Sequence, residues 1–146
     1  MYKIFESNDY EKLTYFFYDN GLEIIPGIKR PDNVVNCWEC MDSISHKLIG
    51  GAVLEIREGA FVVADVAVDN DYRKENIGTQ LMNTIEEEII KAGGSEAWLV
   101  AKIPEFYIKL GWEVVVREQA PDISKCFSCL KYGKECNPQI MYKAFK

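Results

Sequence analysis

Residues 66–81 read VAVDNDYRKENIGTQL, and this stretch decides the fold of the chain. It begins as an apolar strand, passes through a polar turn and ends in a glycine-containing helix start. The first amides of a helix lack partners within the helix and carry partial positive charge, which suits a phosphate anion. Arg73 and Lys74 lie just before this start and supply further positive charge. The stretch therefore predicts either a phosphate cradle over residues 73–79 or a plain strand–loop–helix connection.

The hydrophobic periodicity on both sides of this stretch predicts a mixed α/β protein. Strands are expected at residues 3–5, 34–41, 47–56, 60–68, 97–101, 112–117 and 140–145. Helices are expected after a cap at Asn8 or Asp9 and up to Gly21, over 78–92, and from Pro104 to Leu110. Glu58-Gly59 predicts a tight hairpin between the third and fourth strands.

The composition is that of one ordinary globular domain. Of its 146 residues 48% are hydrophobic and 27% are charged, which is enough to build a core without disulfides or metal. The net charge of −6 disfavours a nucleic-acid or anionic-membrane partner. No apolar run reaches the roughly 20 residues of a membrane span, and residues 1–12 lack the core of a signal peptide. Since the five cysteines cannot all pair, we expect a cytoplasmic protein with reduced thiols.

The opening stretch resembles the acetyl-coenzyme A motif of the GNAT N-acetyltransferases, in which an Arg or Gln is followed by x-x-Gly-x-Gly/Ala. Here the motif runs from Arg73 to Gly78. A second family signature, Phe-Tyr-x-x-Leu-Gly-Phe, resembles the run from Phe106 to Trp112. The resemblance implies a GNAT fold over residues 1–146, a single α/β domain. It implies a mixed central sheet of six to seven strands, splayed between the fourth and fifth and flanked by about four helices.

The same resemblance implies where the acetyl donor, acetyl-CoA, binds. Strands 61–68 and 97–101 splay apart, the backbone of residues 66–68 holds the pantetheine arm, and the amides of residues 74–79 hold the pyrophosphate. The cofactor-binding residues expected on this basis are Val66, Ala67, Val68, Arg73, Lys74, Glu75, Asn76, Ile77, Gly78 and Thr79. Asn76 stands where the motif has its first glycine, and Asn is one of the few other residues that adopt a positive φ.

Two residues are expected to act on the reacting groups. Tyr107 matches the tyrosine that commonly protonates the leaving thiolate in this family; the alternative is a packed aromatic. Asp65 is a lone acid in an apolar strand, where an uncompensated carboxylate is costly. It either orients or deprotonates the amine, or it forms a structural hydrogen bond. Glu23 lies in the loop that usually lines the family's acceptor site, and His46, the single histidine, is expected in an exposed turn.

The cysteines raise a separate question. Residues 119–138 are an expected insertion between the last two strands, and this segment contains Cys126, Cys129 and Cys136. A zinc site, a reversible Cys126–Cys129 pair and free thiols are three alternatives for it. Cys37 and Cys40 are three residues apart in an expected strand, so we expect them on opposite faces.

Together these features predict an enzyme that transfers an acetyl group from acetyl-CoA to a primary amine, of a small metabolite or an amino acid. The alternatives are a non-catalytic acyl-CoA sensor or interaction module, prompted by Asn76 and Glu75, and a protein N-acetyltransferase. A homodimer stays open, because many relatives dimerise but no exposed apolar stripe requires it.

Overall fold

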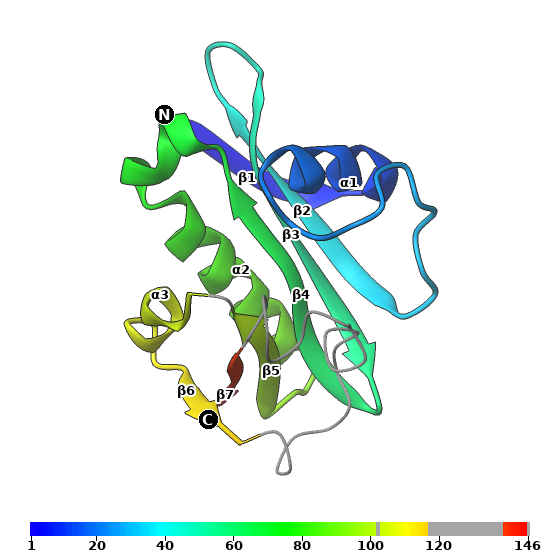
Figure 1. Ribbon diagram of the computed structural model, residues 1–146, viewed down its shortest axis with the longest axis vertical. Helices are drawn as coiled ribbons and strands as arrows, with labels where there is room; N and C mark the ends of the chain where they lie inside the picture. Colours follow the sequence, from blue (N-terminus) through cyan, green and yellow to red (C-terminus); the bar gives the residue numbers. More distant parts are fainter. Residues whose placement is uncertain (102, 117–138, 146) are drawn as a thin grey trace.

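The computed structural model describes residues 1–101, 103–116 and 139–145, apart from the side chain of Lys74. Strands and helices alternate along the chain (Figure 1). The strands are β1 (Tyr2–Ser7), β2 (Val34–Asp42), β3 (Leu48–Arg57), β4 (Ala60–Val68), β5 (Glu96–Ala101), β6 (Glu113–Val115) and β7 (Gln139–Ala144). The helices are α1 (Tyr10–Asp19), the 3₁₀ helix η1 (Asn70–Glu75), α2 (Ile77–Lys91) and α3 (Pro104–Ile108).

The seven strands form one mixed sheet in the order β1-β2-β3-β4-β5-β7-β6. Every neighbouring pair is antiparallel except β4 and β5, which are parallel. The final strand β7 lies between β5 and β6, so it pairs with the preceding strand as predicted. The predicted α/β architecture with a mixed sheet is confirmed.

Helices cover both faces of the sheet, and two adjacent glycines of β3 let them approach. A Cβ at Gly50 would lie 3.0 Å from Cγ2 of Ile77 in α2. A Cβ at Gly51 would lie 2.7 Å from Cδ2 of Leu13 in α1. Because successive residues of a strand point to opposite faces, each glycine makes room for a different helix. The two faces therefore carry separate apolar cores, one with α2 and one with α1.

Several local predictions are confirmed. The Asp9 side chain accepts a hydrogen bond from the Lys12 amide at 3.1 Å and caps α1. Glu58 and Gly59 both have positive φ, 52° and 76°, as the two central residues of a tight hairpin turn require. His46 lies in the exposed turn between β2 and β3.

The two described cysteines lie on opposite faces, as predicted: Cys37 packs in the α1 core and Cys40 in the α2 core. Burial raises the pKa of both thiols, that of Cys40 to about 11. Both side chains therefore stay protonated near neutral pH and behave as small apolar groups.

The region after β5 is shorter than predicted. The helix from Pro104 ends at Ile108, because Gly111 adopts a φ of 95° and the Trp112 amide turns back to the Tyr107 carbonyl at 3.1 Å. Trp112 is buried in the core rather than paired in β6, and Arg117 lies outside the described residues.

The insertion at 119–138, with Cys126, Cys129 and Cys136, lies within the part of the chain that the structure does not describe. The described residues contain no group of three or more side chains placed to hold a metal ion. The three alternatives for the insertion thus stay predictions. None of the helices in the described ranges is long and apolar enough to cross a membrane.

Candidate functional site

The centre of the sheet opens where β4 and β5 separate. These parallel strands pair only at Val62 with Trp98 and Val63 with Leu99. From Ala64 to Val68, the edge of β4 that faces β5 has no strand partner among the described residues. An unpaired edge offers backbone N–H and C=O groups to an extended, amide-containing ligand. Figure 1 shows the chain leaving the end of β4, turning at η1 and running back along the sheet as α2.

A bulge in β4 sets which way its acid points. Val53 pairs with Asp65 and Leu54 pairs with Val63, so Ala64 is an extra residue in β4. On either side of the acid, Ala64 and Ala67 pack against the α1 core. The bulge therefore directs Asp65 to the α1 face of the sheet, while the neighbouring valines of β4 pack on the α2 face.

The start of α2 is suited to bind an anion. Asn76 adopts φ 60° and ψ 21°, the left-handed conformation expected from its place in the motif. Its side chain makes no capping hydrogen bond, and the first helical bond runs from the Gln80 amide to the Asn76 carbonyl at 3.1 Å. The amides of residues 77–79 precede that bond and have no side-chain cap. This arrangement fits the diphosphate of coenzyme A.

Gly78 brings α3 against this helix start. A Cβ at Gly78 would lie 3.1 Å from Cζ of Phe106, so only glycine leaves the ring where it is. The Phe106 ring in turn meets the Tyr107 ring edge to face, with centroids 5.0 Å apart. The packing of α3 on the first turn of α2 therefore fixes the position of Tyr107.

The charged residues in and before η1 have different surroundings. Arg73 and Glu75 are both exposed, and the charge of Glu75 acts on Tyr2 and Cys40, at the β1–β2 side of the sheet. The charge of Glu75 thus acts on the side of the sheet that carries β1 and β2. The side chain of Asp69, which sequence reasoning did not single out, accepts a hydrogen bond from the Asp71 amide at 2.9 Å and organises η1.

The charge of Asp65 acts on Tyr107. Burial, with a further contribution from Glu55, raises the pKa of Asp65 to about 7. Burial and then the charge of Asp65 raise the pKa of Tyr107 to about 12. The Asp65 side chain forms no hydrogen bond or ion pair with any residue in the described ranges. A structural hydrogen bond, the alternative raised from sequence, therefore has no partner in that part of the chain.

Comparison with known proteins identifies the family. Residues 34–114, more than half of the chain, match the family described as Acetyltransferase (GNAT) domain. The chain belongs to this family and is a GNAT-family N-acetyltransferase. No curated protein is significantly similar to it in sequence.

Solved structures share the fold over the whole chain. A GNAT-family acetyltransferase from Staphylococcus aureus Mu50 is 17% identical, with a TM-score of 0.71 and 100% of both chains covered. The PaiA N-acetyltransferase from Thermoplasma acidophilum, in complex with coenzyme A, is 16% identical, with a TM-score of 0.67 and 99% of both chains covered. N-acetylglutamate synthase from Neisseria gonorrhoeae, with coenzyme A and N-acetyl-glutamate, is 15% identical with a TM-score of 0.72. That match covers 100% of this chain and 35% of the synthase.

Proposed function

We propose that this protein transfers the acetyl group of acetyl-CoA to a primary amine, of a small metabolite or an amino acid. One observation carries the proposal: after Val63, β4 parts from β5 and runs on as an edge without a described strand partner toward the start of α2. Asp65 on this part of β4 is near enough to Tyr107 on α3 for its charge to raise the pKa of the phenol. An acid and a base with strongly different pKa values are what amine acetylation needs. The uncapped start of α2 lies at the end of the same strand.

The acetyl donor would be held mainly by backbone. Val66, Ala67 and Val68 supply the unpaired edge of β4 for the amide-containing pantetheine arm. The residues proposed to surround the diphosphate are Arg73, Lys74, Glu75, Asn76, Ile77, Gly78 and Thr79. Because the contacts to the diphosphate are main-chain amides, Asn76 can stand in place of the motif's glycine as long as its φ stays positive.

The proposed chemistry uses both side chains. Asp65 accepts a proton from the ammonium form of the acceptor, and the neutral nitrogen attacks the thioester carbonyl carbon. The attacking nitrogen loses its second proton to water, the carbon–sulfur bond breaks, the sulfur leaves with its electron pair, and Tyr107 gives the sulfur a proton. The negative charge of Asp65 raises the pKa of Tyr107. Proton uptake by Asp65 therefore makes Tyr107 a better acid as the thiolate forms. Tyr107 then regains a proton from Asp65 through water.

The first experiment separates an enzyme from an acyl-CoA sensor. The wild-type chain would be melted with and without excess acetyl-CoA, and free thiol would be followed with a panel of primary amines. We expect stabilisation by acetyl-CoA together with amine-dependent release of thiol. Stabilisation without thiol release for any amine, including peptide N-termini, would contradict transfer and favour the sensor. Release only with peptides would move the acceptor to proteins.

A further inference from the structure

A lysine of β7 ties the turn after α3 to α2. The Lys143 ammonium donates one hydrogen bond to the Leu110 carbonyl and another to Oε1 of Glu86 in α2, both at 2.7 Å. Oε2 of the same carboxylate accepts a hydrogen bond from the Trp112 indole N–H at 3.4 Å. The Lys143–Glu86 pair therefore connects β7 and α2 to both ends of the turn between α3 and β6.

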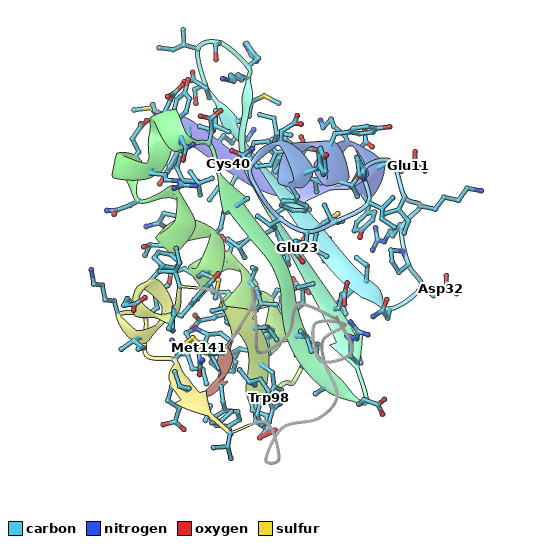
Figure 2. All side chains as sticks on the ribbon, viewed as in Figure 1. Glu11, Glu23, Asp32, Cys40, Trp98 and Met141 are labelled. Atoms are coloured by element: carbon cyan, nitrogen blue, oxygen red, sulfur yellow. The ribbon has the colours of Figure 1, made fainter. Side chains whose placement is uncertain are left out.

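The sheet directs Lys143 to this place. Lys143 pairs with Ala97 of β5, whose side chain is buried in the α2 core, so Lys143 points to the α2 face. Figure 2 labels Met141, which lies two residues earlier on β7 and is buried in the same core. The side chains of Lys143 and Glu86 are 24% and 13% exposed, so solvent screens this ion pair less than an exposed one.

The turn transmits this anchor to Tyr107. The Tyr107 carbonyl accepts hydrogen bonds from the Leu110 amide at 2.9 Å and from the Trp112 amide at 3.1 Å. Leu110 and Trp112 are the two residues that the Lys143–Glu86 pair holds. Because each peptide unit is rigid and planar, a displacement of this turn moves the backbone of Tyr107 with it.

The helix that carries Tyr107 depends on such contacts. α3 has five residues and no side-chain cap in the described part of the chain, and isolated helices of this length are not stable in water. At its other end, Phe106 packs at Gly78 in the first turn of α2. Gly78 and Glu86 are eight residues apart, which is about 12 Å along a helix. Tyr107 is thus held between two separate points of α2.

We propose that Lys143, together with Glu86, is a positioning residue for Tyr107. The pair fixes the turn after α3, and through it the place of the phenol that protonates the leaving sulfur. This inference rests on the proposed function and adds residues that act through Tyr107. A displacement of about 1 Å in a reacting group can cost about a hundredfold in rate, so a remote ion pair of this kind affects turnover.

The position of the Tyr107 ring can be observed without turnover. Tyrosine rings would be labelled with ¹³C, and the Tyr107 signal would be assigned by its absence from the spectrum of Tyr107→Phe. We expect this signal to shift in Lys143→Met and in Glu86→Gln, while the signal of Tyr10 on the α1 face stays in place. Lys91→Met, at an exposed position in the last turn of α2, is the matched control and should shift neither signal.

A double-mutant cycle then tests the effect on catalysis, with the amine that releases most thiol in the panel. Lys143→Met should lower kcat about tenfold and leave KM for acetyl-CoA within about twofold, because the proton donor moves and the cofactor site does not. Glu86→Gln should lower kcat about threefold for the same reason. In a Tyr107→Phe background neither change should lower kcat further, since their effect passes through the phenol. Lys91→Met should leave kcat unchanged.

The outcomes are distinct. Unchanged kcat in both variants, or the same loss in the Tyr107→Phe background as in the wild-type background, would overturn the positioning role. Melting curves show whether each variant is folded, and if Lys143→Met is not, Glu86→Gln completes the cycle. Failure of the proposed function looks different, because the Tyr107 signal would shift as expected while the wild-type chain acetylates no amine. An unshifted Tyr107 signal in the folded variants would overturn the inference in either case.

Discussion

The proposed donor side and the proposed acceptor side of the site are built from different chemical groups. On the donor side, the unpaired edge of β4 and the uncapped start of α2 present main-chain groups, and they belong to one continuous stretch from residue 64 to 79. On the proposed acceptor side, Asp65 and Tyr107 present side chains from β4 and α3. Main-chain groups keep their place when a side chain is exchanged, whereas a site made of side chains changes with each substitution. Substitutions should therefore act differently on the two sides.

The largest effect is expected at Asp65. Asp65→Asn removes the proposed base and should lower kcat by about a thousandfold at pH 8, within the range typical of general base catalysis. In the wild-type chain the rate should rise as the pH rises through about 7, where Asp65 loses its proton, and the variant should lack this rise. A pH profile of kcat/KM measures both. If Asp65→Asn showed the same rise in rate with the same midpoint pH as the wild-type chain, the titrating group would be another residue.

The same substitution should stabilise the fold. Because the folded pKa of Asp65 lies above that of an exposed carboxyl, the folded chain binds an extra proton between about pH 4 and 7. The wild-type chain then loses stability as the pH rises through this window. Asp65→Asn removes that loss and should gain about 2 kcal/mol at pH 8 and little at pH 4. Denaturant unfolding at the two pH values checks the sign. Equal stability of the wild-type chain and Asp65→Asn at pH 8 would mean that burial of the ionised carboxylate does not destabilise the fold.

The next effect is expected at Tyr107. Tyr107→Phe keeps the packed ring and removes the proton donor, so kcat should fall about a hundredfold while stabilisation by acetyl-CoA stays unchanged. Steady-state kinetics and melting curves measure the two quantities separately. Full turnover in the variant would return Tyr107 to the role of a packed aromatic, the alternative raised from the sequence.

A smaller effect is expected on the donor side, at Asn76. Asn76→Val places a β-branched residue at φ 60°, which such residues strongly disfavour, and should weaken acetyl-CoA binding about tenfold. The matched change Asn76→Gly keeps the conformation and should leave the affinity within about twofold. Calorimetry with acetyl-CoA compares them. Weak binding in both variants would mean that the Asn side chain, rather than the backbone, holds the donor.

The smallest effect is expected at the ion pair between Lys47 and Asp69, whose nitrogen and oxygen are 3.3 Å apart. The Lys47 side chain is 55% exposed, and exposed pairs contribute little to stability. Lys47→Ala should therefore change acetyl-CoA affinity by less than about twofold. A larger loss would extend the donor site to the turn between β2 and β3.

The sequence predicted the local structure from β4 to α2 better than the surroundings of Asp65, for a physical reason. The strand, turn and helix start around Asn76 are contiguous, and its left-handed conformation follows from the tolerance of Asn for positive φ. Tyr107 was proposed from a local motif and Asp65 from its isolation among apolar neighbours. All of these are signals within short windows of sequence.

The surroundings of Asp65 had no such signal. Glu55 follows an apolar run as an ordinary polar residue near the end of a strand, and Tyr10 is one of several aromatics in α1. Their approach to Asp65 depends on α1 packing at Gly51 and on the bulge at Ala64. A bulge that contains no glycine has no sequence signal in a run such as FVVADVAV. The sequence therefore could not predict to which face of the sheet Asp65 points.

The measurement that tests the transfer most directly is a mass balance. Wild-type protein and Tyr107→Phe would be incubated with acetyl-CoA and the amine that releases most thiol in the panel, and free thiol and acetylated amine would be quantified together. We expect one acetylated amine for each thiol released by the wild-type chain, and about a hundredfold less of both from the variant. Thiol release without acetylated amine would contradict amine acetylation, and equal yields from the two proteins would contradict the use of Tyr107 as its acid.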